Sequence, residues 1–361
     1  MFYFQSWLVA SIKLAVAASV FSILPLYLTS LSDYLTLSKM QLNSVATAEL
    51  MGFALACAVN YHAIKHGVRS NDNLALLSLC ICNLLSAMTA DFTLFFMIRT
   101  IAGVLAGLVV VRAYEVLSNQ ENTDAAFGKA IAIQMLFTAA LFLILPYWVQ
   151  TYGPRSILYV LSALAAACLL LPPLKAVKAS DFQLSEPLDY SLIFISLGAV
   201  AMIMMTHSAV WSTLGFHANA HEITMEQQGY LFSIGTLFSV FGAMLATLDW
   251  VHEKKSKLLP MAIGLQCLMV GVIIADESTN RFVAATFFFQ LLWNFMLPLV
   301  LGSIASGKQA RVIIGFVLVA QTFGAALGPM VLISGWVLPE VIVMLFITYW
   351  MTASLIKSSQ T

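Results

Sequence analysis

Three ionisable side chains lie inside long apolar stretches of this 361-residue chain: Lys13, Glu49 and Arg99. A charge at the centre of a bilayer costs about 2.5 to 3.5 kcal/mol on insertion scales, so such a residue usually has a partner or a task. Glu49 lies about eight residues into the second stretch and Arg99 about seven residues into the fourth, counted from the same side, which gives both a depth of roughly 10 Å. Glu49 is then either a titratable group whose proton affinity depends on Arg99 and on hydration, or half of a permanently ionised structural pair.

Two further groups of charge lie toward the opposite side. Lys13 is close enough to the end of its stretch for its long stem to reach the interface, and it alternatively acts as a counter-charge or binds an anion. Arg112 and Glu115 are three residues apart, a spacing that brings them together on a helix. We expect them to form an interfacial pair that serves as a gate contact or as a helix end.

Polar and aromatic residues in the middle of several stretches are candidates for the wall of a solute cavity. His207 and Trp211 are four residues apart and share one helix face, although His207 is alternatively a helix-packing group. The full set of cavity candidates is Asn294, Trp293, Gln321, Gln134, His207 and Trp211.

Other chemistry has little support in the sequence. His217, His221, Glu222 and Glu226 have donor types that bind metals, but we interpret them as a solvated loop and predict no metal site. There is no phosphate-binding glycine loop and no nucleophile next to a base, so we expect neither a cofactor nor enzyme activity.

Apolar stretches that are each long enough to cross a bilayer follow one another along almost the whole chain. Hydrophobic residues make up 61% of the sequence and charged residues only 9%, against roughly 25% charged in soluble domains. No period-2 alternation is present, so the stretches predict an all-α integral membrane protein with twelve transmembrane helices. The expected spans are 6-30, 42-63, 73-90, 92-114, 127-149, 155-173, 190-215, 228-249, 258-275, 281-304, 311-333 and 336-356.

Cations gather on one side of these spans, which predicts the orientation. With both termini in the cytoplasm, the cytoplasmic side holds most Lys and Arg residues, and the opposite side holds only Lys39, Arg155 and Arg281. The formal net charge of zero is a sum over two unlike faces and indicates no nucleic-acid partner. We expect a monomer in the cytoplasmic (inner) membrane, with lipid, a small solute and protons as partners.

The chain divides into two predicted six-helix pseudo-repeats. Residues 1-173 form the first bundle, 174-189 a cytoplasmic linker and 190-361 the second bundle. The fifth span contains Gln134, Phe137, Ala139, Ala140 and Leu141, and the eleventh contains Gln321, Phe323, Ala325, Ala326 and Leu327 in nearly the same order. This pattern indicates a duplication.

Three groups of residues form recognisable motifs. The loop after the second span contains Lys65, Gly67 and Arg69, with Ile64 before them, and in the fourth span Arg99 is followed by Gly103 and Gly107. The tenth span contains Trp293, Asn294 and Phe295, followed by Pro298 and Gly302.

The first group resembles the loop G-x-x-x-D-[RK]-x-G-R-[RK] of the major facilitator superfamily, with Ile64 at the acidic position. The second resembles the R-x-x-x-G pattern of that family, and the third resembles a subset of its small bacterial permeases. The chain resembles the superfamily over its whole length.

The resemblance implies a secondary transporter that moves a small organic solute by alternating access, with the solute between the halves. Lys65, Gly67, Arg69, Arg112 and Glu115 would then form a gating region, and Glu49 with Arg99 would couple transport to protons. Two alternatives stay open: efflux of lipophilic compounds or drugs, and a membrane receptor or assembly factor that has kept the fold without transport.

Overall fold

The computed structural model describes residues 5–65, 70–175, 189–275, 277–305, 310–331 and 337–360. Within these ranges the chain is helical and has no β-strand, which confirms the all-α prediction. The chain forms two compact units, Met1–Phe182 and Gln183–Thr361.

The helices have the composition expected in lipid. In the described ranges, seven segments are long and apolar enough to span a bilayer: Lys39–Asn60, Phe92–Ser118, Ala125–Tyr152, Tyr190–Ala220, Met225–Ala246, Lys255–Ala275 and Thr279–Ala305. Shorter apolar helices are Ser6–Ala17, Asp72–Met88, Ser156–Cys168, Phe316–Val331 and Val341–Ser354. The count of twelve spans therefore stays a prediction.

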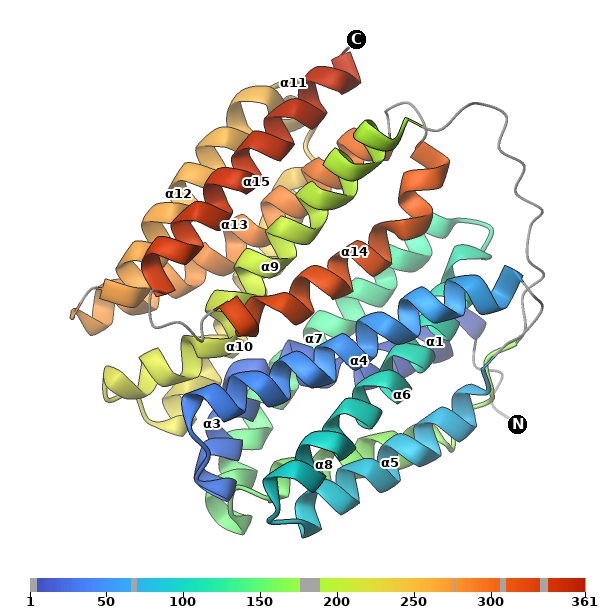
Figure 1. Cartoon of the computed structure of the whole chain (residues 1–361), viewed down its shortest axis with the longest axis vertical. Coiled ribbons are helices and arrows are strands. Elements are labelled where there is room, and N and C mark those ends of the chain that lie inside the picture. Colours follow the sequence, from blue (N-terminus) through green and yellow to red (C-terminus); the bar gives the residue numbers. More distant parts are fainter. Residues whose placement is uncertain are drawn as a thin grey trace. The chain divides into compact units, whose positions relative to one another are not determined.

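The first unit is a helical bundle in which α4 runs along α6 (Figure 1). Helix α5 packs against α6 and α8, and α1 packs against α6 and α7. The helices are α1 (Ser6–Ala17), α2 (Ser19–Ser22), α3 (Leu24–Leu35), α4 (Lys39–Lys65), α5 (Asp72–Met88), α6 (Phe92–Ser118), α7 (Thr123–Tyr152) and α8 (Ser156–Cys168).

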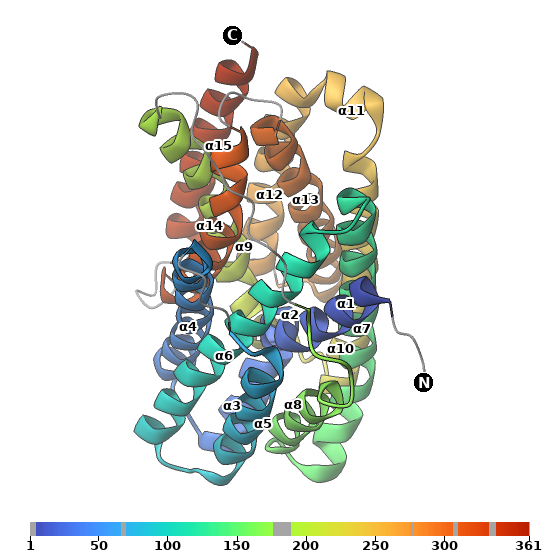
Figure 2. The same cartoon turned by 90° about the vertical axis from the view of Figure 1, so that its right-hand side faces the viewer.

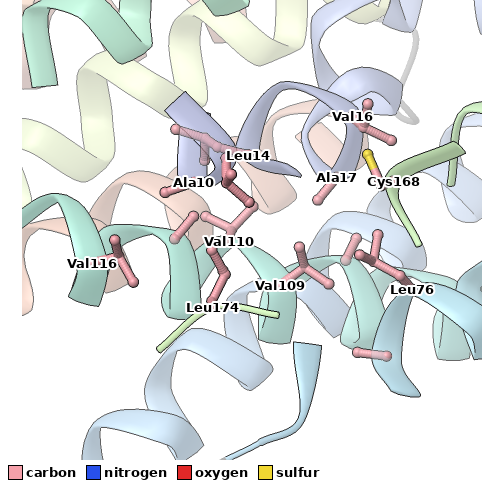
Figure 3. Packing of buried hydrophobic residues seen from close by; sticks show 14 of the residues in the cluster. Ala10, Leu14, Val16, Ala17, Leu76, Val109, Val110, Val116, Cys168 and Leu174 are labelled. Carbon is pink, nitrogen blue, oxygen red and sulfur yellow. The ribbon is translucent and has the colours of Figure 1, made fainter. Parts of the chain in front are cut away.

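Small and branched apolar side chains fill the centre of this unit. Figure 3 shows Ala10 and Leu14 of α1 facing Val109 and Val110 of α6, and all four are buried. Leu174, which follows α8, is buried in the same cluster. The cluster joins α1 to α6, and α6 is the helix that contributes Arg99.

The first predicted span, 6–30, is not one continuous helix. It is interrupted at Ala18 (φ −84°, ψ 2°) and at Ile23 (φ −104°, ψ 19°), which separates α1, α2 and α3. Pro25 at the start of α3 explains the second interruption, because proline lacks an N–H and its ring would clash with the carbonyl of Phe21 four residues earlier. Pro25 is visible in the sequence, but the stretch around it is so uniformly apolar that a single continuous span was predicted.

In the second unit, α14 lies along α9, and α15 packs against α9 and α12 (Figure 2). Helix α13 packs against α10 and α12. The helices are α9 (Tyr190–Ala220), α10 (Met225–Ala246), α11 (Asp249–Glu253), α12 (Lys255–Ala275), α13 (Thr279–Ala305), α14 (Ala310–Val331) and α15 (Val337–Gln360).

Helices at corresponding positions pack together in the two units. The spans of each unit are numbered here in chain order, and a broken span is counted as one. First and fifth spans pair as α1 with α7 and as α9 with α14. Second and fourth pair as α4 with α6 and as α10 with α13, and third and sixth as α5 with α8 and as α12 with α15. The duplication stays a prediction, and this shared pairing is consistent with it.

Candidate functional site

The carboxylate of Glu49 and the guanidinium of Arg99 form an ion pair between α4 and α6. Arg99 is fully buried and Glu49 is 4% exposed. The Nε of Arg99 donates to Oε2 of Glu49 at 3.1 Å, and its Nη2 contacts the other carboxylate oxygen. Two parallel contacts of this kind fix the orientation of both groups as well as their separation.

Two neutral side chains complete the site. The hydroxyl of Tyr27, from α3, donates to Oε2 of Glu49 at 3.1 Å, and Nη1 of Arg99 donates to Oδ1 of Asn83, from α5, at 2.6 Å. The Arg99 guanidinium also lies 5.7 Å from the centre of the Tyr27 ring, within the range of a cation–π contact. Neither residue could be predicted from the sequence by the cost of burying charge, because that cost says nothing about neutral partners. The polar amide of Asn83 in an apolar span was the available signal.

Glycines bring α4 and α6 together at the level of the ion pair. A Cβ added at Gly103, one turn after Arg99, would collide with the backbone carbonyl of Glu49. A Cβ at Gly52 or Gly107 would likewise be too close to backbone atoms of the facing helix. Small residues let membrane helices approach in this way, and the short separation keeps Glu49 within reach of Arg99.

Replacing Gly103 with alanine is expected to lower the free energy of unfolding by about 1 to 3 kcal/mol, because the methyl group must push α4 away. The measurement is unfolding of the purified protein by a denaturing detergent. Gly128→Ala in α7 is the matched control, since nothing lies within 4 Å of a Cβ there. That change should stabilise the helix by about 0.5 to 1 kcal/mol. Equal effects of the two changes would show that α4 and α6 do not touch at Gly103.

A small cavity borders the ion pair inside the first unit. Its volume is about 30 Å³, and it is lined by Glu49 and Asn83 together with residues 16–21 beside the interruption of the first span. A water molecule needs roughly 10 to 15 Å³ of such space, so the cavity is large enough for water next to the carboxylate. The hydroxyl of Ser19, at the interruption, donates to the carbonyl of Val16 at 2.7 Å and satisfies a backbone group freed by the break.

Lys13 is fully buried and paired with Asp72 at the start of α5. Its ammonium lies 2.6 Å from Oδ2 of Asp72, 2.8 Å from Oδ1 of Asn73 and 3.0 Å from the carbonyl of Pro172. These contacts fit the counter-charge interpretation of Lys13 and not a side chain that extends to the surface. Asp72 was missed because the sequence placed it in the connection before the third span.

Arg112 and Glu115 are in contact, and Glu115 also accepts a hydrogen bond from Asn60 of α4 at 3.3 Å. A second nitrogen of Arg112 donates to the carbonyl of Leu174 at 3.1 Å, and the N–H of Leu174 donates to Asp72 at 3.2 Å. The segment after α8 is therefore held from both sides by charged residues. Of the remaining gating candidates, Gly67 and Arg69 and the side chain of Lys65 lie outside the described residues.

The second-unit candidates fall into an aromatic cluster and separate polar groups. His207 of α9 stacks on Trp293 of α13, and Trp211 packs edge-on against Phe232 of α10 at 5.8 Å. The amide of Asn294 donates to the hydroxyl of Ser239 and so links α13 to α10.

The last two cavity candidates lie in different units. Gln134 of α7, in the first unit, donates to the hydroxyl of Ser22 at 3.4 Å. Gln321 is half-buried in α14, in the second unit. A common solute cavity for the six predicted residues stays a prediction.

The four residues interpreted from the sequence as a solvated loop with two histidines lie at the end of α9 and after it. His217 lies in its last turn, and the ring of His221 stacks on Phe282 with 4.6 Å between centres. Glu222 has a positive φ of 58°, and Glu226 accepts a hydrogen bond from Tyr230 at 3.4 Å. No group of three or more His, Cys, Asp or Glu residues suited to a metal occurs in the described part of the chain.

No protein-family model and no curated protein matches the chain. Solved structures match nearly all of it. The nucleoside transporter NupG is 11% identical with a TM-score of 0.72, over 98% of this chain and 100% of that one. A proton dependent oligopeptide transporter is 12% identical with a TM-score of 0.68, over 98% and 97%. The human organic anion transporter MFSD10 is 14% identical with a TM-score of 0.65, over 98% of both chains.

The chain thus has the fold of the major facilitator superfamily of transporters, which confirms the resemblance at the level of the fold.

Proposed function

We propose that this protein is a secondary transporter that moves a small organic solute across the cytoplasmic membrane by alternating access, coupled to protons. The observation that carries the proposal is the buried pair of Glu49 and Arg99 beside a water-sized cavity, in a chain with a transporter fold. A proton carrier needs a titratable group that has a defined partner and access to water; Glu49 is paired with Arg99 and borders a cavity large enough for water.

The proposed coupling step is the transfer of a proton from a hydronium ion in the cavity to the carboxylate of Glu49, which leaves a water molecule behind. Neutral Glu49 no longer holds Arg99 by charge, while Asn83 and the ring of Tyr27 still contact the guanidinium. Arg99 is then free to change its interactions within α4 and α6. Protonation can shift the equilibrium between two conformations of the transporter only as far as the proton affinities of those conformations differ.

The broader features of the proposal rest on the sequence and on packing within each unit. The asymmetry of Lys and Arg favours both termini in the cytoplasm, and the shared helix pairing favours two six-helix repeats with the solute bound between them. One copy of the chain contains both repeats, so we propose that the protein acts as a monomer.

The test is solute-dependent proton movement in liposomes that contain the purified protein and a pH-sensitive dye. Nucleosides, dipeptides and organic anions are the first solute classes to add, because the matched transporters act on nucleosides, oligopeptides and organic anions. We expect one class to alkalinise the outside as solute and protons enter together.

Each other outcome favours a different function. Solute entry without proton movement would contradict coupling but keep transport. Movement restricted to lipophilic compounds, out of the cytoplasmic compartment and against protons, would favour efflux. Binding of a ligand without any flux would favour a receptor or assembly factor.

A further inference from the structure

A second polar site lies inside the second unit, formed by α9, α12, α13 and α15. It is a cavity of about 10 Å³, close to the size that holds one water molecule. The polar residues that line it are Thr206 and His207 of α9, Gln266 of α12, Trp293 of α13 and Thr348 of α15. All of these residues belong to one compact unit, so the site does not depend on the first unit.

Several buried atoms around this cavity have no hydrogen-bond partner. They are both ring nitrogens of His207, the indole Nε1 of Trp293 and Oε1 of Gln266. His207 and Gln266 are each only 2% exposed. A buried polar atom without a partner is destabilising, so a cluster of such atoms around one cavity indicates a polar guest.

The hydroxyl groups in the cavity act as acceptors. Thr206 donates its hydrogen to the carbonyl of Met202, and Thr348 donates its own to the carbonyl of Met344, both at 2.8 Å. Each hydroxyl oxygen therefore has only lone pairs left to offer. Together with Oε1 of Gln266, these oxygens give the pocket three acceptors, which can accept hydrogen bonds from a bound water molecule or an imidazolium as well as from the N–H groups of Trp293, Gln266 and His207.

Aromatic faces cover the imidazole ring. Its centre is 3.7 Å from that of Trp293 at an interplanar angle of 15°, and 5.1 Å from that of Phe289 at 10°. Trp211 lies 5.8 Å away at 27°. The faces of aromatic rings are electron-rich and attract a cation, so an imidazolium here would gain attraction that a neutral ring lacks.

Among the described residues, the side chains around this ring carry no charge. They are Gln266 from α12, Phe289, Gln290 and Trp293 from α13, Thr348 from α15 and Trp211 on the same helix as His207. The Gln290 side chain approaches the ring without reaching hydrogen-bond geometry. The entry of water into the pocket would lower the cost of placing a charge on the ring.

We propose that this pocket is a proton-binding site, in which His207 takes up a proton as water enters. The proton passes from a hydronium ion to the unprotonated ring nitrogen, which leaves a water molecule and an imidazolium that donates from both nitrogens. Oε1 of Gln266 and the pocket water accept those two hydrogen bonds. Release returns the proton to water. The site is separate from Glu49 and does not rest on the proposed transport.

The test is a pH titration of the purified protein in lipid nanodiscs, with ¹⁵N-labelled histidine observed by NMR. The His207 signals are assigned by their loss in His207→Gln, or in His207→Phe if that variant does not fold. We expect neutral-ring signals at about pH 7.5 and imidazolium signals by about pH 5, near the ordinary titration range of histidine. His207 signals that stay neutral to pH 4.5, while the other histidines titrate, would overturn the proposal and leave a purely structural ring.

Two variants separate a proton site from a packed ring. Gln266→Leu removes the acceptor and should lower the proton affinity of His207 by about tenfold, a change of about one pH unit in the midpoint. Gln228→Leu is the matched control, because Gln228 is a buried glutamine that contacts Asn219 and Ile223 and not this pocket, and the His207 midpoint in that variant should match the wild type. An unchanged midpoint in Gln266→Leu would contradict the assigned acceptor. The titration should also be unchanged in Glu49→Gln, so its result is independent of the coupling proposed for Glu49.

Discussion

Replacing Arg99 with methionine is expected to lower the free energy of unfolding by about 3 to 5 kcal/mol, because it leaves the Glu49 carboxylate buried without its counter-charge. Methionine keeps much of the volume of arginine, so the loss reports on charge and hydrogen bonds more than on packing. The double change Glu49→Gln with Arg99→Met should cost less, about 1 to 3 kcal/mol, chiefly for the unpartnered oxygen of Asn83. Unfolding by a denaturing detergent measures all the variants.

The two single changes and the double change form a cycle that isolates the contact. If Glu49 and Arg99 were independent, the double loss would equal the sum of the single losses. A double variant that is more stable than either single variant is the result expected for a buried pair. Additive losses would show that the two groups do not interact.

Arg155→Met provides the matched control. Arg155 is exposed before α8, and its guanidinium lies 4.9 Å from the centre of the Tyr34 ring. An exposed cation–π contact contributes about 0.5 to 1 kcal/mol, so this change should be mild. A loss as large as that of Arg99→Met would indicate a general effect of removing arginine.

The contact between Glu49 and Arg99 could be predicted because burying a charge is costly enough to demand a partner. Their equal depth then identified the partner. Lys13 could be predicted for the same reason, but its partner Asp72 could not. Asp72 lies at a helix start, where the sequence alone does not distinguish a buried carboxylate from a solvated one.

The neutral partners of the ion pair and the breaks in the first span could not be predicted from the cost of burying charge. Tyr27 and Asn83 carry no charge, so only the fold shows that they contact the pair. Pro25 was visible in the sequence, but a proline within an apolar stretch does not by itself reveal whether the helix kinks or stops. The roles of residues from the two units in one solute cavity depend on packing that the sequence pattern does not specify.

Replacing Glu49 with glutamine is expected to abolish proton-driven accumulation of the solute while solute exchange continues. For a neutral solute that enters with one proton, a gradient of one pH unit supports about tenfold accumulation, since 1.36 kcal/mol corresponds to a factor of ten. Glutamine has nearly the same shape and still accepts a hydrogen bond from Arg99, but it takes up no proton. The accumulation ratio should therefore fall from about ten to about one.

Exchange between solute inside and outside the liposome requires no net proton movement, so it measures whether the carrier still binds and turns over. Glu226→Gln is the matched control, because the carboxylate of Glu226 also accepts a hydrogen bond from a tyrosine, Tyr230, but is exposed at the start of α10. It should keep the full accumulation ratio. Exchange retained and accumulation lost only in Glu49→Gln would identify Glu49 as the coupling group. If Glu49→Gln kept tenfold accumulation at normal exchange rates, the pair would be structural, and the proton would have to be carried by another group.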